Sequence, residues 1–220
     1  MKSFQKWNVD TAGKAFGIKQ RPKLDSLEKW LTEKHPATDE ERRDVLKCQT
    51  FLRNGVDYWN EDELKMNFIG PLMLAVNFHH ERYNVFYQRK ITSTVQGIQL
   101  HGTVDCVVAT GRVEPDVPFF FLHEYKRQRS TDADPLAQLL TAMLAARELN
   151  QVKLKGTPTL ENKMYGCYVL GRLWFFVVLD GSEYAQSRAF DTTQDDDMFA
   201  IISLLKAVKV NIENYLANES

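Results

Sequence analysis

Cysteine is scarce in this sequence, which contains three cysteines among 220 residues. Cys48, Cys106 and Cys167 are far apart, and they form no closely spaced pair of the kind that binds zinc. Their number and spacing also do not suggest a disulfide framework. We therefore expect three reduced thiols that pack as small hydrophobic side chains.

Long apolar runs are missing as well. The longest run, Leu173 to Leu179, has the length of a buried strand, whereas a membrane-spanning helix needs about 20 apolar residues. The first ten residues, MKSFQKWNVD, lack the apolar segment of a secretory signal. We expect a cytoplasmic protein with no membrane partner.

An excess of charge of one sign is also absent. The 28 Lys and Arg residues nearly balance the 29 Asp and Glu residues, which gives a net charge of −1. This balance argues against a protein that coats nucleic acid through overall positive charge, but it is compatible with a local basic cleft. Hydrophobic residues make up 44% of the chain, and neither internal repeats nor low-complexity tracts occur. The composition indicates a folded globular protein.

Helical patterns dominate the first part of the chain. Apolar residues recur at helical spacing over residues 24–31, and a capping-box pattern at Thr38 begins a second helix that ends near Gly55. We expect residues 1–55 to form a helical N-terminal appendage, which offers a surface for a protein partner. Residues 56–220 are then expected to form the main domain.

A stronger helix is expected from Asn60, a good N-cap, through residue 76. Strand periodicity then predicts strands over residues 85–88, 99–110, 119–126, 164–170 and 172–179, with a shorter segment at 187–190. Two more helices are predicted, one beginning at Asp134-Pro135 and one over residues 195–215. The expected fold is α/β, with a mixed central sheet of four to five strands flanked by helices on both faces.

Three charged residues stand out within the apolar strands. Glu124 and Lys126 end a strand that is otherwise bulky and apolar, and their spacing of two places them on one face. Asp105 lies in the apolar segment of the preceding strand, where an acid is costly without a cation or a donor. We expect Asp105 and Glu124 to approach each other on adjacent strands.

Two carboxylates at close range indicate a divalent cation. Mg²⁺ (or Mn²⁺) takes oxygen ligands, and such an ion can activate a water for attack on a phosphodiester. The helix that begins at Asn60 supplies another acid. Glu61 shares the apolar stripe of that helix and is preferred as a site residue, while Glu63 remains its competitor.

The pattern Glu61, Asp105, Glu124-Tyr125-Lys126 and Gln138 resembles the PD-(D/E)XK nuclease superfamily, whose fold is restriction-endonuclease-like. The helix at Asn60 also resembles the N-terminal nuclease domains of type I restriction subunits, through Glu-x-x-x-Lys followed by an apolar run and Pro-Leu. The resemblance covers about residues 56–190, and Asp105 departs from it by following Val instead of Pro.

The resemblance implies a role for each matched residue. Asp105, Glu124 and the carbonyl of Tyr125 would bind the metal, and Lys126 would be catalytic. Glu61 would add a further acid at the metal, and Gln138 would lie beside the site.

A basic run follows the proposed catalytic lysine. Lys126, Arg127 and Arg129 are expected to contact nucleic acid through its phosphates, without reading sequence. A solvated loop remains the alternative for this run.

We expect a Mg²⁺-dependent DNA endonuclease or exonuclease that hydrolyses phosphodiester bonds, in a restriction, repair or mobile-element context. Two alternatives remain. One is a catalytically inactive nuclease-fold module that binds nucleic acid or a protein partner, and the other is a structural α/β protein with an internal ion-pair network. The sequence does not predict an oligomeric state.

Overall fold

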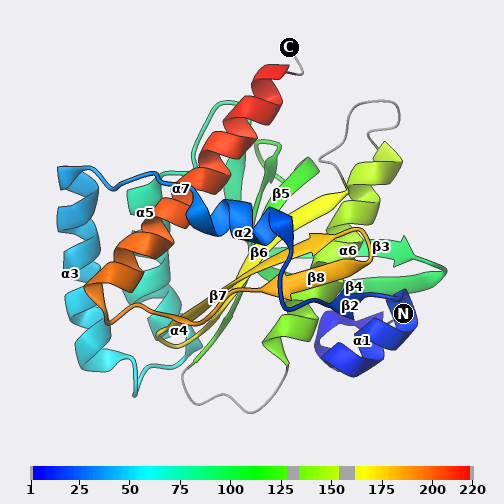
Figure 1. The fold of residues 1–220 in the computed structure, drawn as a ribbon, viewed down its shortest axis with the longest axis horizontal. Coiled ribbons are helices and arrows are strands. Elements are labelled where there is room, and N and C mark those ends of the chain that lie inside the picture. Colours follow the sequence, from blue (N-terminus) through cyan, green and yellow to red (C-terminus); the bar gives the residue numbers. More distant parts are fainter. Residues whose placement is uncertain (1, 128–133, 154–161, 219–220) are drawn as a thin grey trace.

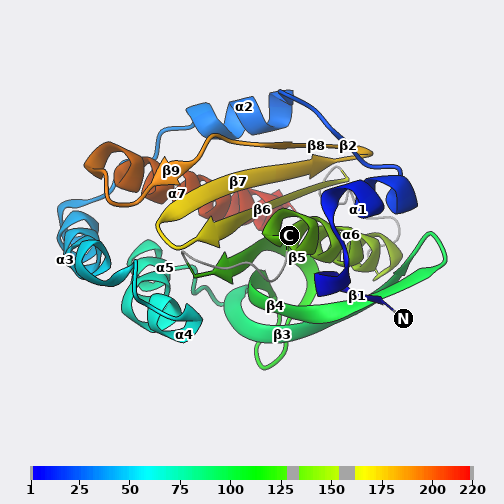
Figure 2. The same cartoon turned by 90° about the horizontal axis from the view of Figure 1, so that it is seen from below.

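The structure is a computed structural model that describes residues 2–127, 134–153 and 162–218. A central mixed β-sheet separates two groups of helices (Figures 1 and 2). The fold is therefore α/β with helices on both faces of the sheet, as the sequence predicts.

The sheet contains nine strands within the described residues. Its order is β1-β4-β5-β6-β7-β8-β2, with β3 paired to β4 and β9 paired to β7. The strands are β1 (Lys2–Ser3), β2 (Lys19–Gln20), β3 (Asn84–Val95), β4 (Ile98–Thr110), β5 (Asp116–Lys126), β6 (Lys163–Leu170), β7 (Leu173–Asp180), β8 (Glu183–Gln186) and β9 (Phe190–Asp191).

Nine strands exceed the predicted four to five. The five long strands β3 to β7 include the segments with clear strand periodicity, whereas β1, β2, β8 and β9 have two to four residues each. A strand this short contains too few residues to show an alternating pattern. Most of the segment predicted at residues 187–190 is not strand, since β8 ends before it and β9 begins at its last residue.

Helices cover the sheet unequally. The helices are α1 (Val9–Phe16), α2 (Asp25–Thr32), α3 (Asp39–Gly55), α4 (Glu61–Leu64), α5 (Gly70–Val76), α6 (Pro135–Lys153) and α7 (Asp195–Asn218), with a short 3₁₀ turn at Phe4–Lys6. One hydrophobic cluster joins α2, α3, α4, α5 and α7 to one sheet face, and another joins α1 and α6 to the opposite face (Figure 2). None of the described helices combines the length and apolar character needed to cross a membrane.

The helix predicted over residues 60–76 is continuous but irregular. Asn60 and Glu63 form a capping box at its start. Between α4 and α5 the backbone widens into a π-helical turn over Lys65–Ile69. Pro71 follows this turn and has no N–H group to donate to the carbonyl four residues earlier. The π-helical turn, with hydrogen bonds between residues five apart, accommodates this missing donor, so the helix continues past Pro71.

Residues 1–55 are closely packed against the rest of the chain. β1 pairs with β4, and β2 pairs with β8, so the segment contributes strands as well as helices. Trp30 of α2 is buried against the sheet and donates a hydrogen bond from Nε1 to the carbonyl of Leu204, 2.9 Å away. The domain boundary at residue 55 stays a prediction. The segment before it contains strands as well as helices, and its buried side chains belong to the two hydrophobic clusters that cover the sheet.

The three cysteines are free and buried, as expected. Cys106 and Cys167 lie on β4 and β6, and β5 separates these strands. Burial raises the pKa of all three thiols, so they remain protonated.

Candidate functional site

The candidate site lies where the pairing of β4 and β5 ends. The last paired residues at this end are Cys106 and His123. Beyond them, Oδ2 of Asp105 accepts a hydrogen bond from the backbone N–H of Tyr125 at 2.9 Å, in place of a backbone carbonyl. The side chain of Asp105 therefore takes the place of a backbone hydrogen bond between β4 and β5, and this contact with β5 fixes the position of its carboxylate.

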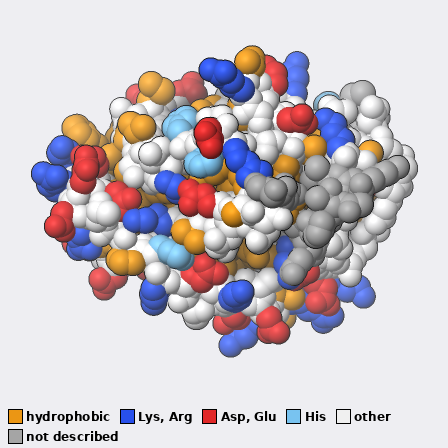
Figure 3. Space-filling view, turned by 90° about the horizontal axis from the view of Figure 1, so that it is seen from above, with side chains coloured by type: hydrophobic (Ala, Val, Ile, Leu, Met, Phe, Trp, Pro, Cys, Tyr) orange, Lys and Arg blue, Asp and Glu red, His pale blue; other side chains and the backbone are white. Residues whose placement is uncertain are grey.

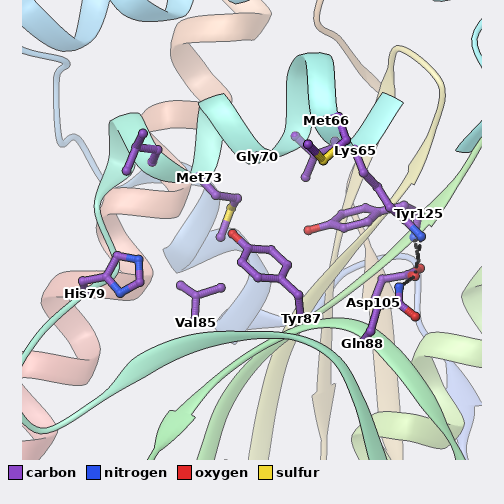
Figure 4. Close-up of a pocket in the computed structure, with 12 residues that line it drawn as sticks. Lys65, Met66, Gly70, Met73, His79, Val85, Tyr87, Gln88, Asp105 and Tyr125 are labelled. Carbon is purple, nitrogen blue, oxygen red and sulfur yellow. Dashed lines mark hydrogen bonds and ion pairs between the residues drawn. The ribbon is translucent and has the colours of Figure 1, made fainter. Parts of the chain in front are cut away.

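The second carboxylate oxygen of Asp105 contacts two further side chains. Lys65 Nζ lies 2.9 Å from Oδ1, and Gln88 Nε2 donates to the same oxygen at 2.6 Å (Figure 4). Burial alone would raise the pKa of Asp105, but the hydrogen bond and the charge of Lys65 outweigh it and hold that pKa below its usual value. Asp105 is therefore an anion at neutral pH, although it is only 8% exposed.

Glu124 is the second acid of the site and has no measurable exposure. Gln138 of α6 donates from Nε2 to Glu124 Oε2 at 2.7 Å, while Oε1 of Glu124 accepts no hydrogen bond from the residues that the structure describes. Burial, followed by the nearby charge of Asp105, raises the pKa of Glu124 well above its usual value. The two acids thus differ strongly in their tendency to ionise.

Lys126 and Glu61 complete the group. Lys126 Nζ lies 3.7 Å from Glu61 Oε2, and Lys65 Nζ lies 2.7 Å from Glu61 Oε1. Glu61 therefore bridges two lysines, one from the helix and one from β5. Glu63 instead caps its own helix by accepting the backbone N–H of Asn60, so the structure brings Glu61 to the site and leaves Glu63 outside it.

Five predicted side chains thus come together: Glu61, Asp105, Glu124, Lys126 and Gln138. Arg127 is exposed beside them, and Arg129 lies outside the described residues. His123 lies on the opposite face of β5, as strand alternation predicts, and its ring contacts Phe121, Tyr125 and Trp174.

Two site residues were not predicted from the sequence. Lys65 is the lysine of the Glu-x-x-x-Lys pattern that begins at Glu61, but no role in the site was predicted for it, although a spacing of four residues pairs opposite charges on a helix. Gln88 has a left-handed backbone with φ of 52°, and it gives no sequence signal because neither its residue type nor its spacing predicts that conformation.

The donor set can be tested for its fit to Mg²⁺. The described residues include no group of three or more His, Cys, Asp or Glu side chains arranged to hold a metal ion. However, Mg²⁺ commonly binds one or two protein carboxylates and keeps several waters. Asp105 and Glu124 provide such a pair, and the buried Oε1 of Glu124 lacks a partner. These residues fit Mg²⁺, with Lys65 as a competing cation at Asp105.

The carbonyl of Tyr125 is the third expected ligand. The N–H and C=O groups of one strand residue face the same neighbouring strand. Because the Tyr125 N–H donates to Asp105, the carbonyl of Tyr125 faces that side as well. This direction agrees with the role that the resemblance implies.

Comparison with protein-family models gave no match, and no curated protein matched the sequence.

Proposed function

We propose that this protein is a Mg²⁺-dependent phosphodiesterase that hydrolyses DNA, on a restriction-endonuclease-like fold of the PD-(D/E)XK type. The observation that carries the proposal is the pair of buried acids Asp105 and Glu124, which lie where the pairing of β4 and β5 ends, with Lys126 beside them. Such a concentration of buried charge is expensive for the fold unless it serves binding or catalysis.

Each side chain has a proposed part in the reaction. Asp105, Glu124 and the Tyr125 carbonyl would hold Mg²⁺, which supplies an activated water and charge stabilisation when bound. Lys126 would orient the attacking water and stabilise the negative charge that develops on the phosphate. Glu61 holds the Lys126 ammonium near the site, and Gln138 orients Glu124.

DNA is the proposed substrate because the basic run continues from Lys126 to Arg127 and Arg129. Lys and Arg side chains are otherwise interspersed with acidic ones on the face shown in Figure 3. Contacts from a short basic run to phosphates would be sensitive to salt and independent of sequence. The proposal therefore describes a nuclease with weak sequence preference.

The test is cleavage of plasmid and single-stranded DNA by the purified protein with Mg²⁺ or Mn²⁺. We expect Lys126→Ala to lower the rate by roughly 10²-fold or more, a loss typical for a group that stabilises transition-state charge. Lys153→Ala is the matched control, since this exposed lysine pairs with Asp116 away from the site. An inert protein, or equal cleavage by Lys126→Ala, would refute the proposal.

A second candidate is a nuclease-fold module that binds DNA or a protein without cutting. The contact between Lys65 and Asp105 favours it, because an internal ammonium already neutralises the acid that a metal would need. Calorimetric titration with Mn²⁺ separates the two candidates. Binding that is lost in Asp105→Asn supports the nuclease, whereas no binding by the wild type supports the module.

A further inference from the structure

A cavity of about 440 Å³ opens directly beside the candidate site, between β3 and the helical segment from Lys65 to Leu74. Figure 4 shows it from the side, with the helix above and the sheet below. Its walls are mainly apolar and aromatic, formed by Met66, Ile69, Met73, Leu74, Val85 and Tyr87. Lys65, Gln88 and Asp105 line one end, so the cavity and the candidate site share these residues.

A buried hydroxyl group is directed into this cavity without a strong hydrogen-bond acceptor among the described residues. Tyr125 is 1% exposed, and among the described residues its hydroxyl oxygen makes no hydrogen bond of good geometry; the nearby thiol of Cys106 is only a weak acceptor. Figure 4 shows this hydroxyl directed from the Lys65 end toward Met66 and Met73. At neutral pH a tyrosine hydroxyl carries its proton and can donate a hydrogen bond. A buried donor that has only a weak acceptor favours a ligand that supplies a stronger one.

Tyr87 forms a second aromatic wall of the cavity. Its hydroxyl is also directed toward Met73 (Figure 4), and its side chain is 43% exposed at the opening. Burial of the hydroxyl raises the pKa of Tyr87, so it too can donate. Met66 and Leu74 are largely exposed at the rim, with 76% and 69% exposure.

These features together define the chemistry of an occupant. Tyrosine rings and flexible methionines suit a flat, polarisable group, and two hydroxyl donors suit a group that carries acceptors at its edge. The volume is within the range of small-ligand sites. A nucleobase has all of these properties, whereas an aliphatic chain would give the Tyr125 hydroxyl no acceptor better than the Cys106 thiol.

We propose that this cavity binds an unpaired nucleobase of DNA whose adjoining phosphate lies at the Lys65 and Asp105 end. The inference rests on the proposed function, and it narrows the substrate to single-stranded DNA or DNA with an extruded base. A paired base cannot enter a pocket of this kind without leaving the duplex. The base would then fix the position of the neighbouring phosphodiester at the acids.

Fluorescence anisotropy in EDTA measures this binding without cleavage. The probes are a fluorescein-labelled single-stranded oligonucleotide, the same backbone without its bases, and the corresponding duplex. We expect the wild type to bind the single strand about tenfold more tightly than either of the other probes, a preference typical of one stacked base.

Two variants remove walls of the cavity without entering the buried core. Tyr87→Ala and Met66→Ala are expected to lose most of the preference for the probe with bases. Tyr58→Ala is the control, because Tyr58 is an 85% exposed tyrosine that does not line the cavity, and it should retain the full preference.

Equal affinity of the wild type for the probes with and without bases would overturn the inference. The same conclusion follows if Tyr87→Ala weakens binding of both probes equally. Because the readout is binding, a protein that never cuts DNA can still show the base preference. A protein that cuts DNA but shows no preference would refute the base pocket and leave the nuclease proposal standing.

Discussion

The ammonium group of Lys65 lies 2.9 Å from Oδ1 of Asp105 and 2.7 Å from Oε1 of Glu61. The π-helical turn begins at Lys65, and the side chain of this residue reaches Asp105 within β4. Lys65 is mostly buried, and despite that burial its hydrogen bonds to the two acids raise its pKa, so it stays charged. A metal ion that binds Asp105 therefore has to share this carboxylate with a permanent cation.

Replacement of Lys65 by Met is expected to strengthen Mn²⁺ binding by roughly tenfold or more. A unit charge about 4 Å from a divalent cation repels it by about 2 kcal/mol even in bulk water, and about 1.4 kcal/mol is a tenfold change in affinity. Isothermal titration calorimetry measures the change directly. Lys47→Met is the control, because Lys47 is exposed and pairs with Asp44. Weaker Mn²⁺ binding by Lys65→Met than by the wild type would contradict competition at Asp105.

Glu124→Gln is expected to stabilise the fold at neutral and alkaline pH, by roughly 1–3 kcal/mol, because a neutral amide removes the cost of ionising a buried carboxyl group next to Asp105. The pKa of Glu124 is higher in the folded than in the unfolded state, so folding favours the protonated carboxyl group. The contribution of Glu124 to stability is therefore fully present below its unfolded pKa and is lost as pH rises through its folded pKa.

Urea denaturation over a range of pH tests this expectation. The difference in stability between Glu124→Gln and the wild type should shrink as the pH falls and Glu124 becomes protonated. Asp105→Asn provides the contrast, because the pKa of Asp105 is lowered in the folded state. The stabilisation from Asp105 is present above its unfolded pKa and is lost as pH falls through its folded pKa. A lower stability of Glu124→Gln at neutral pH would indicate that Glu124 is a favourable structural anion.

Much of the frame around the site could be predicted from local patterns. Capping boxes at Thr38 and Asn60 are local features of the chain, and both helices begin where these residues predict. Strand alternation correctly separated His123 from Glu124 on opposite faces of β5. Helix phase correctly favoured Glu61 over Glu63. Each of these features depends on residues close together in the sequence.

The remaining features depend on contacts between distant segments. β1 and β2 exist only because β4 and β8 offer them edges to pair with. Gln88 reaches Asp105 through a left-handed backbone that its residue type does not predict. The cavity beside the site results from the packing of a π-helical turn over β3, and no periodicity in the sequence encodes such a space.

Trp30→Ala is expected to destabilise the whole protein by about 3–5 kcal/mol, the usual cost of removing a large buried aromatic side chain. Trp30 packs edge-on against Phe176, with ring centroids 5.1 Å apart, and it belongs to the hydrophobic cluster shared with α7. If residues 1–55 were an independent appendage, this loss would not extend to the sheet.

Chemical denaturation followed by two probes distinguishes these cases for Trp30→Ala. Circular dichroism and the fluorescence of the remaining tryptophans should report one shared transition at a lower denaturant concentration than in the wild type. Phe51→Ala is the control in the same segment, since Phe51 is 65% exposed and its loss should change stability by no more than about 0.5 kcal/mol. Two separate transitions would show that the first 55 residues fold on their own.

Glu61 and Glu63 provide the sharpest matched pair, because they lie two residues apart on one helix and differ in their contacts. Glu63→Ala removes half of a capping box and should lower stability by roughly 0.5–1 kcal/mol while leaving DNA cleavage unchanged. Glu61→Ala releases Lys65 and Lys126 together, and it should slow cleavage by about 10- to 100-fold, as the loss of a supporting side chain at a metal site does.

Single-turnover cleavage rates and urea denaturation on both variants measure the two effects separately. The two substitutions should produce opposite profiles, since one affects mainly stability and the other mainly rate. If Glu63→Ala is fully folded but no longer cleaves DNA, then Glu63 acts in the site and the choice of Glu61 is wrong. Equal cleavage rates for Glu61→Ala and the wild type would mean that Lys126 does not need its contact with Glu61 for cleavage.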